Sequence, residues 1–136
     1  MPNRPEEFFK LGEHYICDLS GCDPALLFDS QRARALFTQA VRTSGLTIVD
    51  EGFYEFSPHG FTCFLLLAES HASLHAWPEF GYCAIDLFTC NLNLDTRPLV
   101  NTLKGLFGSQ HASVQRIHRE GLVESQQMKG VLIPHG

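Results

Sequence analysis

The fold is decided by residues 61–89, which read FTCFLLLAESHASLHAWPEFGYCAIDLFT. Three short apolar runs, 61–68, 74–77 and 82–89, follow one another in this stretch without a helical segment between them. The second run stops at Pro78, and each run has the length of a strand. Strands that follow one another directly favour antiparallel hairpins over parallel βαβ units. The stretch therefore predicts an antiparallel sheet in which 61–68 is a buried strand.

The sequence on either side predicts two helices and further strands. Signals for helix beginnings and ends occur at Asp23-Pro24, Asp29-Ser30, Gly45, 95–98 and Gly108. Strands are predicted at 12–19, 46–56 and 114–118, and the tail after Gly121 is expected to be loosely held. We predict an α+β fold, a two-layer α/β sandwich in which two helices cover one face of an antiparallel sheet. The other face needs cover, which favours a dimer.

Length and charge restrict the class of protein further. The chain has 136 residues, enough to bury a core as one domain spanning 1–136. The formal net charge is -5 with 10 Lys and Arg residues, which argues against nucleic-acid binding. No apolar run approaches the roughly 20 residues that span a bilayer, and residues 1–7 lack the apolar stretch of a secretion signal. The five cysteines form no CxxC pair, so we expect free thiols in a cytoplasmic protein.

Polar and reactive side chains gather in residues 68–79, between two apolar strands. If 71–77 is extended, alternation gives one face to His71, Ser73, His75 and Trp77 and the other face to Ser70, Leu74 and Ala76. About a dozen residues downstream, another predicted strand is followed by a thiol, Cys90. This crowding of reactive groups marks the segment as the candidate site.

Three interpretations of the cluster remain open from the residues alone. Ser70 could be a nucleophile with a histidine as its base, although no G-x-S-x-G elbow surrounds it. His71 and His75 could bind a metal with Cys83 or Cys90, but a spacing of four suits a helix and the H-E-x-x-H glutamate is absent. We therefore expect no metal. The residues could also be core and turn residues without chemistry, although burying many polar groups without partners is costly.

A longer pattern resembles a known family. Residues 69–79, ESHASLHAWPE, are similar to the processing site of the small bacterial S-adenosylmethionine decarboxylase proenzymes, which depend on a pyruvoyl group. The similarity covers roughly residues 11–119 in one register, and continues through Gly12-x-His14, Asp18, Cys22, 44–49, 56–60 and 81–90. A string of this length is more specific than an isolated glycine motif.

The resemblance implies that the chain makes its own cofactor. In the family, the hydroxyl of the serine that matches Ser70 attacks the carbonyl of the residue that matches Glu69. This step turns the amide into an ester, and β-elimination followed by hydrolysis leaves a pyruvoyl group. The chain would become a β chain, 1–69, and an α chain, 70–136.

The resemblance also implies roles for other residues. The pyruvoyl ketone forms a Schiff base with the substrate amine and withdraws electrons while CO₂ leaves. Cys90 matches the family's general acid, His75 matches the base used in processing, and Thr62 matches a processing hydroxyl. Phe56 matches the aromatic residue that stacks on adenine, and Glu79 matches the carboxylate that binds the ribose hydroxyls.

The active site of the family is built across a dimer, so a homodimer of αβ units with shared sites is expected. One protomer would supply Ser70 and Cys90, and the other would supply Phe56, Thr62, His75 and Glu79. The implied reaction is the decarboxylation of S-adenosylmethionine, which provides the aminopropyl donor for spermidine biosynthesis. A small-molecule substrate is therefore expected, with neither a nucleic acid nor a membrane as partner.

Four positions depart from the family's usual residues. Thr62 replaces a serine and keeps the hydroxyl, but its methyl group restricts the rotamer, so slow processing is expected. Cys63, Ala76 and Asn91 stand where glycine, threonine and glycine are usual. Two alternatives follow: a pyruvoyl-dependent L-arginine or L-ornithine decarboxylase of the same family, or an unprocessed, non-catalytic paralogue that acts through a partner. The retained adenine-stacking and ribose-binding residues favour the nucleoside substrate.

Overall fold

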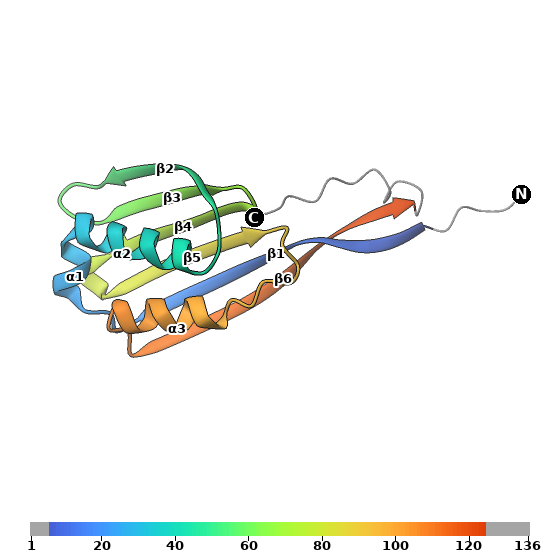
Figure 1. The fold of residues 1–136 in the computed structure, drawn as a ribbon. Helices are drawn as coiled ribbons and strands as arrows, with labels where there is room; N and C mark the ends of the chain where they lie inside the picture. Colours follow the sequence, from blue (N-terminus) through green and yellow to red (C-terminus); the bar gives the residue numbers. More distant parts are fainter. Residues whose placement is uncertain (1–5, 125–136) are drawn as a thin grey trace, which may run out of the picture.

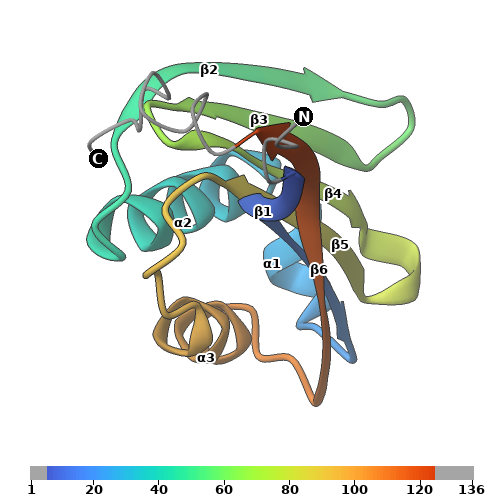
Figure 2. The ribbon, with the colours of Figure 1, turned by 90° about the vertical axis from the view of Figure 1, so that its right-hand side faces the viewer.

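An antiparallel sheet of six strands, in the order β2-β3-β4-β5-β1-β6, is the frame of the computed structural model, which describes residues 6–124 (Figure 1). Seen at right angles, the helices lie on one side of this sheet (Figure 2). No helix within the described residues is long and apolar enough to cross a bilayer. The elements are β1 (Glu6–Ser20), α1 (Pro24–Phe28), α2 (Ser30–Thr43), β2 (Ile48–Glu55), β3 (Phe61–Leu67), β4 (Ser70–Trp77), the 3₁₀ turn η1 (Pro78–Phe80), β5 (Tyr82–Thr89), α3 (Arg97–Leu106) and β6 (His111–Glu124).

The predicted α+β sandwich is confirmed, with one additional short helix. α1 precedes α2 because two capping aspartates follow each other closely. Asp23 accepts a hydrogen bond from the backbone N–H of Ala25 at 3.1 Å, and Asp29 accepts one from the N–H of Arg32 at 3.2 Å. Each carboxylate satisfies an N–H group that a helix beginning would otherwise leave without a partner. The chain therefore turns once between the two helices before it crosses the sheet.

The two strands at one edge of the sheet are longer than predicted. β1 and β6 pair along their whole length, from Glu6 opposite Glu124 to Ser20 opposite His111, and run past the ends of the other strands (Figure 1). The prediction of a loosely held tail after Gly121 is therefore wrong for residues 122–124, which are paired with β1. The rest of that tail, 125–136, lies outside the described residues.

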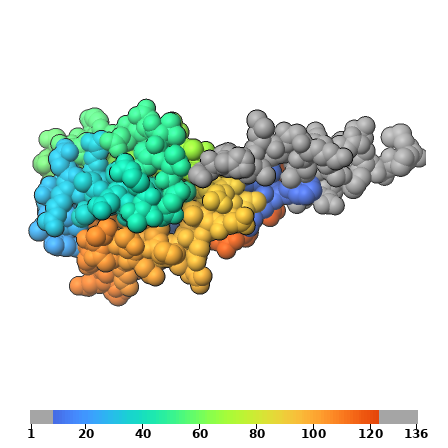
Figure 3. Space-filling view, viewed as in Figure 1, coloured from blue at the N-terminus to red at the C-terminus, as the bar shows by residue number. Residues whose placement is uncertain are grey.

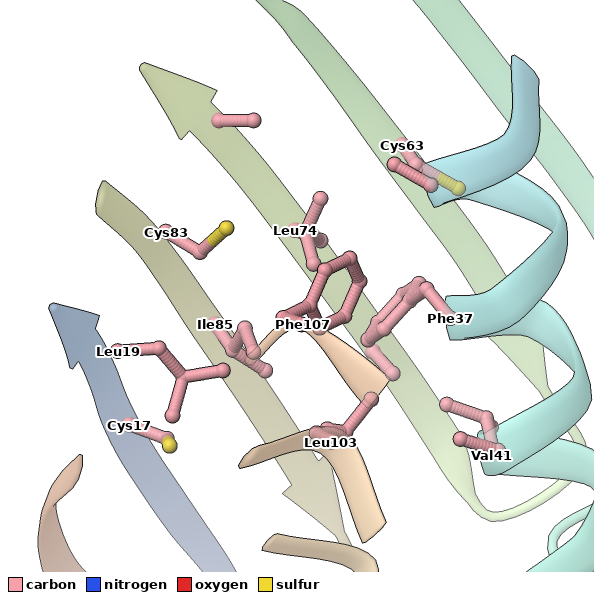
Figure 4. Close-up of a cluster of buried hydrophobic side chains, with 14 of the residues drawn as sticks. Cys17, Leu19, Phe37, Val41, Cys63, Leu74, Cys83, Ile85, Leu103 and Phe107 are labelled. Carbon is pink, nitrogen blue, oxygen red and sulfur yellow. The ribbon is translucent and has the colours of Figure 1, made fainter. Parts of the chain in front are cut away.

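The core lies between the helices and the sheet. Phe37 and Val41 of α2 and Leu103 and Phe107 at the end of α3 point toward the strands, and each is at most 1% exposed (Figure 4). In both helices the spacing of four residues puts the two side chains on one face. Fully burying a side chain of this kind contributes about 1.5–3 kcal/mol. Together α1, α2 and α3 cover this face of the sheet (Figure 3).

The other face of the sheet is apolar and uncovered within one protomer. β3 alternates between buried residues on the helix side and exposed residues on this open face, where Phe64 is 41% and Leu66 is 44% exposed. Tyr54, Trp77 and Ile117 are also exposed, and the strand pairings place them on the same open face. The prediction of a fully buried strand at 61–68 is therefore wrong for one of its two faces. An open sheet face of this composition is typical of a surface that another protein element covers.

A carboxylate is buried on the helix side of β1. Glu13 is 1% exposed and contacts Lys10, Tyr15 and Arg116, the last at 2.6 Å. A register shift between Lys10 and Gly12 accompanies this arrangement. Burial alone would raise the pKa of Glu13, but hydrogen bonds from Lys10, Tyr15 and Arg116 lower the pKa from 4.5 to about 2. The charged form of Glu13 therefore stabilises the fold.

We predict that Glu13→Gln lowers the free energy of unfolding by about 2 kcal/mol at pH 7, because it removes charge-assisted hydrogen bonds. The folded-state pKa lies below the ordinary value, so this stability is present above pH 4.5 and is lost as the pH falls toward about 2. The measurement is urea unfolding across this range. Glu51→Gln, which disturbs a more exposed pair with Arg34, is the control and should change stability by less than about 1 kcal/mol. Equal stability of both variants at pH 7 would contradict the prediction.

Candidate active site

The predicted cleavage point lies in the tight turn between β3 and β4. Leu67 pairs with Ser70, so the turn consists of two residues, Ala68 and Glu69. Hairpin turns of this length usually contain glycine or asparagine, which accept a positive φ. Here the positive φ, 150°, falls on Ser70. A non-glycine residue in such a conformation is strained by about 1–3 kcal/mol, and the strain lies beside the peptide bond that is predicted to break.

The carbonyl oxygen of Glu69 accepts two hydrogen bonds from Cys90. The backbone N–H of Cys90 donates at 3.0 Å and its thiol donates at 3.1 Å. The contact follows from the strand register, because Ser70 pairs with Thr89, the residue before Cys90. Two donors at this separation can stabilise negative charge on the oxygen when the carbonyl carbon is attacked. The thiol is thus within reach of the cleavage site as well as available for proton transfer.

Hydrogen bonds with Thr47 hold the same turn from the other side. The N–H of Ala68 donates to the carbonyl of Thr47 at 2.9 Å, and the N–H of Thr47 donates to Oε1 of Glu69 at 3.0 Å. The Glu69 side chain is 1% exposed, and its Oε2 has no hydrogen-bond partner among the described residues. Thr47 was not singled out from the sequence, because it acts through its backbone and backbone contacts leave no signal in residue type.

Thr62 and His75 form a second group, on the open face of the sheet. The two residues pair across β3 and β4, and Oγ1 of Thr62 lies 2.8 Å from Nδ1 of His75. When Nδ1–H of His75 donates to Thr62, Nε2 keeps its lone pair and can accept a proton. The hydroxyl of Thr62 is therefore a hydrogen-bond partner of the histidine.

A cavity of about 280 Å³ opens beside this pair. Four of its lining residues, Phe56, Thr62, His75 and Glu79, were predicted from the sequence as site residues. The other lining residues are His59, Gly60, Phe61, Ala76 and Trp77. Nε2 of His59 contacts Oε2 of Glu79. His59 was not singled out from the sequence, because its partner is twenty residues away in the chain.

The structure therefore divides the predicted site residues into two groups. Glu69, Ser70 and Cys90 lie at one end of β4, and the cavity residues lie around its other half. Ser70 and His75 are five residues apart on one extended strand, which corresponds to about 16 Å. One protomer does not bring His75 to Ser70.

His71 and the buried cysteines occupy structural positions. The ring of His71 stacks on Phe64 at 5.5 Å and lies 5.8 Å from Phe88. Burial raises the pKa of Cys17 and of Cys63 to about 11, which disfavours either thiol as a proton donor near neutral pH. All five cysteines lie in the described range and are free; four of them are buried, and Cys90 is partly exposed. Within residues 6–124, no three His, Cys, Asp or Glu side chains are arranged to hold a metal ion.

Known proteins share this sequence and fold. A model of the family described as S-adenosylmethionine decarboxylase matches residues 13–120. The S-adenosylmethionine decarboxylase proenzyme of Pyrococcus horikoshii is 38% identical over 109 residues, which cover 80% of this chain and 78% of that protein. The proenzyme of Carboxydothermus hydrogenoformans is 34% identical over 114 residues, covering 84% of this chain and 90% of that protein.

A solved structure agrees with the sequence matches. The crystal structure of the adenosylmethionine decarboxylase from Aquifex aeolicus has a TM-score of 0.75 and 33% sequence identity, and the match covers 85% of this chain and 95% of that chain. The chain belongs to the S-adenosylmethionine decarboxylase family.

We predict that Thr62→Val slows self-cleavage about tenfold, because valine keeps the shape but cannot accept the hydrogen bond from His75. Thr62→Ser is the matched control and should cleave at least as fast as the natural chain, since it keeps the hydroxyl without the rotamer restriction. The rate of chain cleavage is followed by denaturing intact mass. Cleavage of Thr62→Val at the natural rate would remove the Thr62–His75 contact from processing.

Proposed function

We propose that the chain is a self-cleaving proenzyme that breaks the Glu69–Ser70 bond, makes a pyruvoyl group from Ser70 and decarboxylates S-adenosylmethionine. The observation that carries this proposal is the pair of hydrogen bonds from Cys90 to the carbonyl oxygen of Glu69, at 3.0 and 3.1 Å, beside a serine with strained backbone. The names of the related proteins support the same reaction. Because the strained serine and the carbonyl donors are in place, the residues present fit the formation of the group.

Cleavage begins with Ser70. Its Oγ attacks the carbonyl carbon of Glu69, and the negative charge that develops on the carbonyl oxygen is stabilised by the N–H and thiol of Cys90. The C–N bond then breaks, the nitrogen takes up a proton, and an ester replaces the amide. Relief of the strain at φ 150° favours this step, because the backbone at Ser70 is no longer fixed by a peptide bond to Glu69.

His75, supplied by a second copy of the chain, is the base for the second step. It removes the α-proton of Ser70, the ester C–O bond breaks, and the carboxylate of Glu69 leaves as the new end of residues 1–69. The dehydroalanine that remains on 70–136 tautomerises to an imine, and water converts the imine into the pyruvoyl ketone with release of ammonia. When Nδ1–H of His75 donates to the hydroxyl of Thr62, Nε2 is free to take up this proton.

The mature site combines one proton donor with a substrate cavity. The pyruvoyl group supplies an electrophilic carbonyl that withdraws electrons from the substrate's α-carbon while CO₂ leaves. Cys90 lies next to Ser70 in the register and donates the proton that replaces CO₂. Phe56 offers a face for adenine, and Glu79 accepts hydrogen bonds from the ribose hydroxyls, since both line the cavity.

The two groups of residues meet in a homodimer. Within one protomer the strand separates Ser70 from His75 by about 16 Å, so a second copy must bring its own cavity to Ser70. The exposed apolar residues of the open sheet face offer the surface for this contact. Polar groups on that face already have partners within the protomer, among them Tyr82 on Asp18 at 2.5 Å and Ser73 on Asp86 at 3.5 Å. Covering the face would therefore leave few polar groups without partners.

The test of the chemistry is the denaturing intact mass of purified protein, with and without borohydride in the presence of S-adenosylmethionine. We expect two fragments that split between Glu69 and Ser70, with a covalent substrate adduct on 70–136. Ser70→Ala should stay as one chain of 15.2 kDa without activity, whereas Ser73→Ala, three residues along the same strand, should cleave. Adducts with arginine or ornithine alone would overturn the proposed substrate, and a natural chain that stays intact would overturn the proposed cleavage.

The test of the shared site is complementation between inactive variants. Ser70→Ala disables one group and Glu79→Ala disables the other, so a mixed dimer retains one complete site. Coexpression of the two should restore about a quarter of the natural activity, since random pairing leaves about a quarter of the sites intact. Ser70→Ala with Cys90→Ala is the matched control and should restore nothing, because both residues belong to the same group. Equal recovery in the two mixtures would contradict sites shared between protomers.

A further inference from the structure

His59 connects three separate parts of the chain at the edge of the cavity. It belongs to the turn between β2 and β3, and its Nε2 contacts Oε2 of Glu79 in η1. The ring also packs edge-on against Phe28 of α1, with 5.3 Å between ring centroids and an angle of 73°. Two contacts with different parts of the chain therefore hold the imidazole.

The backbone holds the turn in place independently of these side chains. The N–H of Phe56 donates to the carbonyl of Gly60 at 2.8 Å, which closes the turn. Gly60 has a φ of +98°, and a Cβ there would lie 3.1 Å from the carbonyl oxygen of Ala76. Only glycine fits this approach to β4 without strain. His59 is therefore carried by a turn whose position is set by the sheet.

The position of the Glu79 side chain depends on a contact such as the one with His59. It lies in a 3₁₀ turn of three residues, and its side chain is 33% exposed. A long carboxylate side chain in this setting loses conformational freedom when it binds a ligand, and that loss weakens binding. The contact with His59 fixes Oε2 in advance and leaves Oε1 to accept hydrogen bonds from a ligand. Both residues line the same cavity of about 280 Å³.

We infer that His59 is a positioning residue that holds Glu79 as a preorganised acceptor for a vicinal diol, and that this pair selects nucleoside substrates over amino acids without a ribose. The inference rests on the proposed function and adds to it the residue that makes the carboxylate selective. His59 touches neither Ser70 nor Cys90, which lie at the other end of β4, so it acts on binding and not on bond breaking.

Three variants separate these effects. His59→Phe keeps an aromatic ring beside Phe28 and removes the N–H, and His59→Gln keeps an N–H at similar reach. The matched control is His111→Phe, which changes an exposed histidine on the edge strand β6, at the opposite edge of the sheet from β2. We expect His59→Phe to raise KM for S-adenosylmethionine about tenfold with little change in kcat, and His59→Gln to recover most of that loss. Intact mass should show complete cleavage in all three.

Binding provides a second measurement that does not require the mature enzyme. In the uncleaved Ser70→Ala protein, adenosine should bind more tightly than 2′,3′-dideoxyadenosine by about tenfold, and His59→Phe should remove most of this difference. A difference that survives in His59→Phe, or an unchanged KM in an enzyme that decarboxylates S-adenosylmethionine normally, would overturn the role of His59 and leave the proposed function intact. A natural chain that neither cleaves nor distinguishes the two nucleosides would overturn both.

Discussion

The hydrogen bonds between Cys90 and the carbonyl oxygen of Glu69 are the interaction on which the arrangement of the site depends. They can form only if the turn between β3 and β4 is two residues long and Ser70 is opposite Thr89. The turn contains neither glycine nor asparagine, so the positive φ is displaced onto Ser70. Bonds from Cys90 on one side and with Thr47 on the other hold the turn against that strain. The same contacts that stabilise the fold thus aim two donors at one carbonyl oxygen.

A second constraint is the length of β4. An extended strand cannot fold back, so residues at its two ends stay about 16 Å apart however the surrounding side chains pack. In a single protomer, His75, the proposed base, is therefore too far from Ser70 to remove its proton. An apolar open face on the same sheet offers a surface through which a second copy can approach. In the proposed dimer, the need to cover the face and the need to complete the site are met by one contact.

Local sequence pattern predicted the sheet well and the polar contacts less well. Short apolar runs and the break at Pro78 identified the strands in 61–89, and consecutive strands correctly predicted antiparallel pairing. The outer halves of β1 and β6 were missed because residues 6–11 do not alternate, and their pairing depends on a partner more than a hundred residues away. The link from Cys90 to Glu69 depends on the register of two hairpins, and the link from His59 to Glu79 joins two turns. Neither contact produces a periodic pattern in the sequence from which it could be predicted. The resemblance to a family suggested most site residues, but their division into two groups follows from the strand geometry.

The unusual residues near the site bear on whether the chain has kept its chemistry. A non-catalytic role drew its support from Thr62 and Cys63. The hydroxyl of Thr62 lies 2.8 Å from His75, so the polar contact proposed to support processing is present. Cys63 is fully buried on the helix side of β3, opposite to the face that carries Thr62, and it does not line the cavity. Asn91 donates its N–H to Thr89 at 2.9 Å and so supports the loop after β5 without displacing Cys90 from Glu69. These three differences leave His75 and Cys90 in place, and a binding module would have no physical reason to contain a strained serine beside a carbonyl oxygen that accepts two hydrogen bonds.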